Sequence, residues 1–386
     1  MDFGLSSDQR AMQESARRFA RTELPSLADD LEATSAPVPQ AWLDRYADMG
    51  FLGVNSEVHY GGLGLPHLDA LIVMEEFAKI SVAVAFPVFE CCAGPVRIVE
   101  RYGSNALKDR VVRDVVAGKM LVAISMSEPN AGSALTDLRT RARVENGKII
   151  IDGTKRWCSG AGHSGGYVVF CRFNEIPGAK GIGAVFVDRD TKGLAFGPQE
   201  RLMGFRGVPS ADMYFDGVAV LEDQLLVGPG GFSQLMGVFN LERLGNATMA
   251  LGVAAGALEQ VLEYVQERRQ FGKPIVDFQA VQVRLAEIAI KVEAARLLIY
   301  RAAANAGTGL PSLRESSMAK CFVNEITREV TGAALQLMGG YGYACDYGME
   351  RRMRDAWGWG IAGGAIDVQK VNIASDLVGR RFNQRN

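Results

Sequence analysis

The sequence predicts an α+β fold in which a central β domain separates two helical domains. Three observations predict it: helical periodicity in the first part of the chain, a middle run of short β-rich segments, and long helical stripes thereafter. The 386 residues, 48% of them hydrophobic, are enough to bury a substantial core across several subdomains. We therefore expect an N-terminal helical domain over 1–118, a β domain over 119–228 and a C-terminal helical domain over 229–386.

The N-terminal domain is predicted to begin with a helix over SSDQRAMQESARRFARTEL. Ser6 or Ser7 can cap this helix, and Asp8 then lies in its first turn. LDALIVMEEFAKIS and VRIVERYG continue the helical pattern. HYGGLGLPHL, which follows the first helical region, is rich in glycine, but no strand precedes it, so we interpret it as a loop and not as a phosphate-binding turn.

The middle domain is predicted from turn residues between β-rich runs. Asn146-Gly147 separates RARVE from KIIIDG and is the strongest short hairpin signal in the chain. YVVFCRF, IGAVFVD and ADMYFDGVAV follow as further strands, separated by Gly, Pro and Asn.

Helical periodicity returns after GPGGF. Leu251, Leu258, Leu262 and Val265 form one apolar stripe, and a second runs from Val281 to Ile299 at spacings of three and four. These stripes predict long antiparallel helices of a bundle, and we assign them to packing and not to chemistry.

Composition excludes several classes of function. The formal charge is −2, with Lys and Arg dispersed among Asp and Glu, which argues against a nucleic-acid footprint or a basic membrane patch. We expect no targeting signal and no apolar run long enough to cross a bilayer. The dispersed charge favours a small-molecule substrate. The six cysteines form no CxxC pair, so we expect no metal site and no disulfide framework. We therefore expect a reducing, cytoplasmic location.

Five motifs occur in order along the chain: SEPNAGS, RWCSG, RRQFGKPI, QLMGGYGY and MERRMRDA. Taken singly, they are a turn, an aromatic residue in a hairpin, a helix end and ordinary helix segments. Together they resemble the acyl-CoA dehydrogenase family over essentially the whole chain. The resemblance implies the acyl-CoA dehydrogenase fold with a C-terminal four-helix bundle, a homotetramer, and FAD as the cofactor.

The same resemblance implies which residues contact FAD. Arg268, Gln270 and Phe271 would reach the FAD of a neighbouring subunit, so the active unit is expected to be at least a dimer. Two positions depart from the family: Ala134 stands for an Asp, and Ala365 for a Thr that hydrogen-bonds FAD. The implied cofactor-binding residues are Ile124, Met126, Ser127, Gly132, Ser133, Trp157, Ser159, Arg268, Gln270, Phe271, Gln279, Gln336, Gly339, Gly340, Ala365 and Asp367.

The family's usual catalytic base is missing. Where most members carry Tyr-Glu-Gly-Thr, this chain has Ala-Gly-Gly-Ala over 362–365, and glycine cannot accept a proton. Glu242 in FNLERLG occupies the place where isovaleryl-type and long-chain-type members carry their base. Without the resemblance, Glu242 would be interpreted as a solvated or ion-paired helix residue beside Arg243.

The resemblance therefore implies α,β-dehydrogenation of an acyl-CoA. Glu242 would remove the α-proton, the β-hydride would pass to flavin N5, and the main-chain N–H of Gly363 would still bind the thioester oxygen. Electrons would leave to an electron-transfer flavoprotein. The small residues over 362–365 favour a bulky acyl group. The candidate substrate-binding residues are Phe86, Phe89, Glu90, Ser133 and Arg243.

Two other functions remain open. The sulfinopropionyl-CoA desulfinases, redox-neutral lyases of the same family, share SEPNAGS and the IAGG ending, but resemble this chain less at Glu242, where they carry Gln, and near Phe86, where they carry Arg. The protein could also be a structural subunit of a mixed dehydrogenase oligomer.

Overall fold

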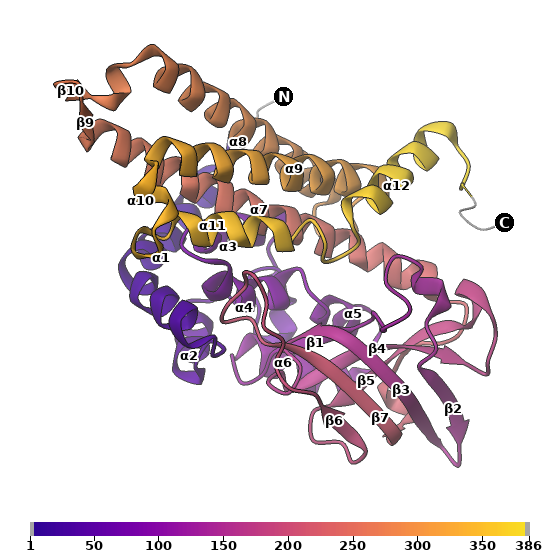
Figure 1. Ribbon diagram of the computed structural model, residues 1–386. Helices are drawn as coiled ribbons and strands as arrows, with labels where there is room; N and C mark the ends of the chain where they lie inside the picture. Colours follow the sequence, from indigo (N-terminus) through magenta and orange to yellow (C-terminus); the bar gives the residue numbers. More distant parts are fainter. Residues whose placement is uncertain (1–3, 383–386) are drawn as a thin grey trace.

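The computed structural model describes residues 4–382 and has the predicted order of helices, sheet and helices. Figure 1 shows the sheet beside the N-terminal helices, with the long C-terminal helices lying across them. One large apolar core joins the N-terminal helices to the C-terminal bundle and to one face of the sheet, and a smaller core covers the other face. The α+β prediction is confirmed.

The N-terminal helices begin with the predicted cap. Ser6 precedes the first helix and accepts a hydrogen bond from the Gln9 N–H, while the Gln9 side chain bonds back to the Ser6 N–H. The glycine-rich segment after the second helix holds only a short 3-10 turn over Val58–Tyr60, as expected of a loop. The helices are α1 (Ser7–Thr34), α2 (Gln40–Asp48), α3 (His67–Ala78), α4 (Val82–Cys92), α5 (Val96–Tyr102) and α6 (Asn105–Val116).

One expectation about apolar runs was wrong. The segment 82–102 is long and apolar enough to cross a membrane by length and composition. It folds as the two short helices α4 and α5, and its apolar window is entirely buried inside the protein. Its hydrophobicity therefore serves the interior, where these helices pack against α3, α7 and the sheet.

The central sheet has the strand order β6-β7-β3-β2-β4-β5-β8, with β1 parallel to β4. It contains the five predicted strands as β2, β3, β4, β5 and β7, and the short strands β1, β6 and β8 were not predicted. Asn146 and Gly147 have φ angles of 51° and 74°, which is the left-handed turn that a two-residue hairpin needs. The strands are β1 (Val122–Ser125), β2 (Arg141–Glu145), β3 (Lys148–Ser159), β4 (Gly166–Phe173), β5 (Ile182–Asp188), β6 (Leu194–Phe196), β7 (Ser210–Leu221) and β8 (Leu225–Val227).

The C-terminal helices form the predicted bundle, extended by a small hairpin. The stripe from Leu285 to Ile299 is buried as expected, but Leu262 in the other stripe is 38% exposed. The end of its helix runs out toward the hairpin at the edge of the molecule (Figure 1). Val261 and Val265 at this end are fully buried, so Leu262 lies on a different, exposed side of the helix. The elements are α7 (Phe232–Glu267), β9 (Arg269–Gln270), β10 (Lys273–Pro274), α8 (Gln279–Ala306), α9 (Leu313–Met338), α10 (Gly340–Tyr343), α11 (Met349–Gly358) and α12 (Ile366–Val378).

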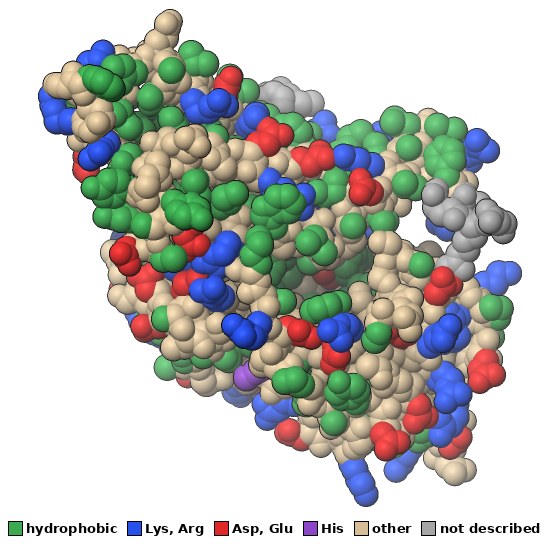
Figure 2. Space-filling view, viewed as in Figure 1, with side chains coloured by type: hydrophobic (Ala, Val, Ile, Leu, Met, Phe, Trp, Pro, Cys, Tyr) green, Lys and Arg blue, Asp and Glu red, His purple; other side chains and the backbone are tan. Residues whose placement is uncertain are grey.

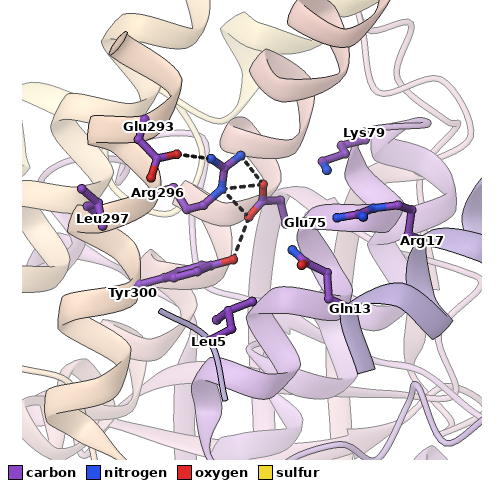
Figure 3. Close-up of a pocket in the computed structure, with 9 residues that line it drawn as sticks. All are labelled: Leu5, Gln13, Arg17, Glu75, Lys79, Glu293, Arg296, Leu297 and Tyr300. Atoms are coloured by element: carbon purple, nitrogen blue, oxygen red, sulfur yellow. Dashed lines mark hydrogen bonds and ion pairs between the residues drawn. The ribbon is translucent and has the colours of Figure 1, made fainter. Parts of the chain in front are cut away.

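A buried ionic contact joins the two helical domains. Glu75 on α3 is 1% exposed and accepts hydrogen bonds from Arg296 at 2.8 Å and from the Tyr300 hydroxyl at 3.2 Å, both on α8. Figure 3 shows these side chains meeting in a polar pocket, with Glu293 bonded to the outer edge of Arg296. Because the pocket's charges pair with one another, we assign it to domain packing.

We predict that Arg296→Met destabilises the protein by about 3–5 kcal/mol, because it leaves the Glu75 carboxylate buried and uncompensated. Urea unfolding followed by circular dichroism measures this. Glu293→Gln is the matched control, since it removes only the solvent-exposed partner of the same Arg296 and should cost less than about 1 kcal/mol. Equal effects of the two substitutions would contradict the assignment.

Candidate active site

The middle of α7 is buried on all sides, and it carries several polar side chains. Glu242 is 9% exposed, Arg243 6% and Asn246 2%. Polar groups in such a helix must find partners inside the protein. Arg243 donates to Asn240 on the same helix, which in turn donates to the Pro311 carbonyl at 3.0 Å.

Glu242 is a buried carboxyl group with an altered proton affinity. Burial raises its pKa to about 8, and the positive charges of Lys320 and Arg243 partly oppose this rise. Burial likewise lowers the pKa of Arg243 to about 10, with Glu242 opposing the change. A carboxylate with this pKa can take a proton from a weak carbon acid near neutral pH.

The loop between α11 and α12 contains the two glycines that replace the family's Glu and Gly. Gly363 and Gly364 have φ angles of 64° and 88°, a conformation that favours glycine. Asn246 on α7 holds the start of the loop, because it donates hydrogen bonds to the carbonyls of Trp359 at 3.1 Å and Ala362 at 3.3 Å. Its far end is held by Gln369, which donates to the Gly364 carbonyl at 3.3 Å.

The fold brings Glu242 and Gly363 together. A Cβ atom added at Gly363 would lie 3.9 Å from Oε1 of Glu242. The carboxylate of α7 therefore reaches the space into which a side chain at position 363 would project. Within residues 4–382, no group accepts a hydrogen bond from the Gly363 N–H, so this donor is available beside the carboxylate.

Lys320 on α9 also lies at this place, and the sequence interpretation missed it. Its side chain has no exposed surface and donates to the Ala362 carbonyl. Asn324, one turn further along α9, donates to the Asn246 side chain at 3.0 Å and so supports the same loop. The sequence did contain a signal: Lys320 lies three residues before Val323 and seven before Thr327, so helical spacing places it on the same buried face of α9.

The candidate acyl-binding residues of α4 lie close by. Phe86 and Phe89 are buried beside Trp359. Phe86 stacks on its ring with centroids 6.5 Å apart, and Phe89 meets it edge-on with centroids 5.2 Å apart. Packing against the start of the glycine loop accounts for both rings. Glu90 is 5% exposed, its Oε2 has no hydrogen-bond partner, and burial followed by the charge of Glu242 holds its pKa well above the usual value.

The first set of predicted flavin residues converges from β1 and β3. The Arg156 N–H donates to the Ser127 carbonyl at 2.9 Å, and the Cys158 thiol to the Ile124 carbonyl at 3.1 Å. Trp157 between them is 53% exposed and has a φ of 61°, unusual for a bulky residue. The Trp157 ring is therefore not part of the core.

Buried Glu128 fixes the turn that follows β1. Its carboxylate accepts the N–H groups of Arg139 at 2.6 Å and Thr140 at 2.8 Å, and pairs with fully buried Lys155 at 2.9 Å. Lys155 also donates to the Met126 carbonyl at 3.0 Å. The segment with Met126, Ser127, Gly132 and Ser133 is thereby held against the end of β3, and a Cβ at Gly132 would meet no atom within 4 Å.

The second set lines a groove of about 540 Å³ between the end of α7 and the α9–α10 turn. Arg268 and Gln270 come from one side, Gly339 and Gly340 from the other. Phe271 at the tip of the β9–β10 hairpin is 94% exposed. Figure 1 places this hairpin at the opposite end of the long helices from β1 and β3, so the two sets of residues do not meet within one chain.

Four other predicted site residues lie on or beside the C-terminal helices α8, α9 and α12. Gln279 is the first residue of α8 and is exposed, as is Gln336 near the end of α9. Ala365 precedes α12 and Asp367 lies in its first turn.

Figure 2 shows a deep hollow between the helical layer above and the strands below. No cluster of His, Cys, Asp and Glu within residues 4–382 is arranged to hold a metal ion.

Comparison with known families accounts for almost the whole chain. Residues 6–119, 123–218 and 229–378 match the N-terminal, middle and C-terminal domains of acyl-CoA dehydrogenases. The chain belongs to the acyl-CoA dehydrogenase family. It is 36% identical to a 3-sulfinopropanoyl-CoA desulfinase of Paraburkholderia xenovorans, with 99% of each chain covered. It is 35% identical to a probable acyl-CoA dehydrogenase of Mycobacterium leprae, with 97% of each covered.

Several solved structures superpose closely on this protein. Butyryl-CoA dehydrogenase from Megasphaera elsdenii has a TM-score of 0.94 and 29% identity, covering 98% of this chain and all of that one. A chain in a structure of the electron transferring flavoprotein of Acidaminococcus fermentans has a TM-score of 0.94 and 31% identity, with the same coverage. PigA with FAD and proline has a TM-score of 0.93 and 26% identity, covering 98% of this chain and 99% of that one.

We predict that Gly363→Ala destabilises the protein by about 1–2 kcal/mol because its φ is left-handed. Its Cβ would also lie 3.0 Å from the Lys320 ammonium nitrogen, which must then move. Thermal unfolding measures the change. Gly332→Ala is the matched control: Gly332 lies in the helical interior of α9, where a Cβ meets no atom within 4 Å, so alanine should stabilise by about 0.5–1 kcal/mol. A neutral effect of Gly363→Ala would contradict this interpretation of the loop.

Proposed function

We propose that this member of the acyl-CoA dehydrogenase family is an FAD-dependent dehydrogenase that oxidises the α,β C–C bond of an acyl-CoA thioester, with Glu242 as its base. The observation that carries the proposal is the approach of the Glu242 carboxylate to the space above Gly363. The usual base position is empty of side chain, and another helix supplies a buried carboxylate to the same place.

The residues present fit a bound flavin. Trp157 offers an exposed aromatic face beside Ser159, and the strained backbone at Trp157 holds that ring out of the core. Arg268 in the distant groove is suited to a phosphate, because a guanidinium stays charged and bonds at two points. When bound, FAD would supply the hydride acceptor for the substrate β-carbon.

Glu242 and Gly363 would divide the work at the substrate α-carbon. The Glu242 carboxylate takes the α-proton, and the Gly363 N–H donates a hydrogen bond to the thioester oxygen as negative charge builds on it. Loss of the side chain at 363 leaves this main-chain donor in place. The glycine loop, held by Asn246, keeps the donor fixed relative to the base.

The acyl group would lie between α4 and the glycine loop. Glu90 is the polar residue on that side, with Phe86 and Phe89 backing it, while Ser133 and Arg243 complete the candidate contacts. The small residues over 362–365 favour a bulky acyl group.

We further propose an assembly of two or more copies, in the family's usual tetrameric form. The exposed ring of Phe271 and the two separated sets of flavin residues are explained if each hairpin reaches the FAD of a neighbour. Val283, Ile290 and Leu297 on α8 are also exposed and recur every seven residues, as a helix-packing face would. Electrons would pass to an electron-transfer flavoprotein. Free thiols at all six cysteines fit a cytoplasmic setting.

A redox-neutral desulfinase is the second candidate, favoured by the 36% identity to a 3-sulfinopropanoyl-CoA desulfinase. A sulfinate tail is anionic and needs a cation near the end of the acyl pocket. Among residues 4–382, the neighbouring charge that affects the Glu90 pKa is the negative charge of Glu242. This environment favours an uncharged acyl group and hence the dehydrogenase.

The experiment that tests the function is the visible spectrum of the purified protein, followed anaerobically as straight, branched, cyclic and dicarboxylic acyl-CoAs are added. Bleaching of bound flavin by one thioester would support the dehydrogenase. Bound flavin that no thioester bleaches, together with sulfite release from 3-sulfinopropanoyl-CoA, would support the desulfinase. Protein that purifies without flavin and gains it only with a partner chain would support a structural subunit.

Glu242→Gln should lower the rate of flavin reduction by about 10²–10⁴-fold while FAD stays bound, because an amide cannot take the proton. Stopped-flow absorbance measures the rate. Glu263→Gln, an exposed residue on the same helix, should leave the rate unchanged. Turnover retained in Glu242→Gln would show that the base lies elsewhere.

The rate of flavin reduction should rise with pH and level off above pH 8. Glu242 must be ionised to act, and burial raises its pKa to about 8, so the active carboxylate form is lost as the pH falls below that value. Each pH unit further down should cost about tenfold in rate at low substrate concentration. A profile that is flat between pH 6 and 9 would contradict the assignment of Glu242.

A further inference from the structure

Lys320 is a buried cation with no direct ionic partner. Its side chain is completely inaccessible, yet no carboxylate oxygen of residues 4–382 lies within 4.0 Å of its nitrogen. Lys155, the other fully inaccessible lysine in the core, bonds Glu128 at 2.9 Å. An unpaired ammonium group in such a place is costly, and its position therefore needs a reason.

The reason lies in the space beside Gly363. A Cβ atom at that residue would be 3.0 Å from the Lys320 nitrogen, 3.4 Å from the Asn246 amide nitrogen and 3.9 Å from a Glu242 oxygen. Three polar groups from two helices thus surround a space that holds no side chain. Lys320 also donates to the carbonyl of Ala362, whose peptide carries the Gly363 N–H. One amine therefore contacts the oxyanion donor's own peptide and faces the candidate base.

We propose that Lys320 is a positioning residue for catalysis, which holds Glu242 in its ionised form across the space beside Gly363 and fixes the peptide whose N–H receives the thioester oxygen. The inference rests on the proposed role of Glu242 as base. In the reactive state Glu242 is a carboxylate and Lys320 an ammonium ion. Transfer of the substrate α-proton makes Glu242 neutral, and Lys320 keeps its own proton.

The local charges agree in direction. Burial raises the Glu242 pKa, and among its neighbours Lys320 opposes that rise most strongly. Burial and the charge of Arg243 lower the Lys320 pKa, and Glu242 raises it. The other titratable neighbours are Glu90 on α4, which interacts with Glu242, and Cys321 beside Lys320. Each member of the pair therefore favours the charged form of the other.

Hydrogen bonding to the Ala362 carbonyl does not by itself require a lysine at position 320. The Ala362 carbonyl already accepts a hydrogen bond from Asn246 at 3.3 Å, so the loop has a neutral anchor. Any donor of similar length could supply the second bond. What only a cation adds is the stabilisation of a nearby carboxylate, and Glu242 is the carboxylate whose charge raises the Lys320 pKa. Lys320→Gln separates the two contributions, because glutamine can still donate to Ala362 but carries no charge.

The test compares pH profiles of anaerobic flavin reduction in the flavin-loaded wild type, Lys320→Gln and Lys320→Met. Both variants should move the rise in rate to higher pH by about one to three units, because Glu242 loses a neighbouring cation. Lys320→Met should in addition raise KM, since the Ala362 peptide loses its bond. Lys291→Gln is the control. Lys291 lies on α8 and pairs with the exposed Glu329 of α9, so its loss should leave the pH profile unchanged. An unshifted profile in Lys320→Gln would overturn the proposal.

A second measurement does not depend on turnover. Thermal unfolding of Lys320→Gln, Glu242→Gln and the double variant gives a double-mutant cycle. Coupled charges predict that the double variant loses less in unfolding temperature than the sum of the two single losses. Additive losses, or failure of both Lys320→Gln and the double variant to fold, would overturn the proposal. If no thioester bleaches the wild-type flavin, the dehydrogenase proposal fails, and this cycle still decides the pairing.

Discussion

The burial of a carboxylate in the central helix α7 is the constraint on which the rest of the site depends. A charged group removed from water must be neutralised or compensated by nearby charges and hydrogen bonds. Around Glu242 the compensation is deliberately incomplete: Lys320 and Arg243 are close enough to affect its proton affinity, but neither makes a direct ionic bond. A carboxylate in a short ion pair would lose its basicity, whereas this one stays able to take a proton. Glu128, by contrast, is tightly bonded to Lys155 and to two main-chain N–H groups.

The absence of a side chain at position 363 lets the glycine loop lie close to the buried Glu242 carboxylate. With no side chain at position 363, the loop can adopt two successive left-handed residues and approach α7 and α9 closely. The space left free is where Glu242 and Lys320 converge. A glutamate at 363 would have to displace the Lys320 nitrogen, which lies 3.0 Å from the position of its Cβ. A side chain at 363 would therefore require the end of the Lys320 side chain to move.

Much of the architecture could be predicted because it rests on local signals. The Ser6 cap, the Asn146-Gly147 turn and the apolar runs of β4 and β5 each depend on neighbouring residues and formed as expected. The failures came where the environment was distant. Leu262 continues a helical stripe, but it lies on an exposed side of α7, while Val261 and Val265 beside it are buried. The apolar segment 82–102 meets a membrane criterion by composition, yet it is covered by elements far along the chain.

The sequence by itself determined the order of the domains through local periodicity, and the resemblance to the family's motifs led us to predict Glu242 as the base in place of the usual one at position 363. Only the tertiary structure decided that Glu242, Lys320 and Gly363 meet, that Trp157 stands exposed, and that Arg268 and Gly339 share a groove remote from β1 and β3. These relations depend on how α7, α9 and the glycine loop pack in three dimensions. In the sequence Lys320 is one lysine among 42 basic residues, and its meaning comes from the helix and loop that enclose it.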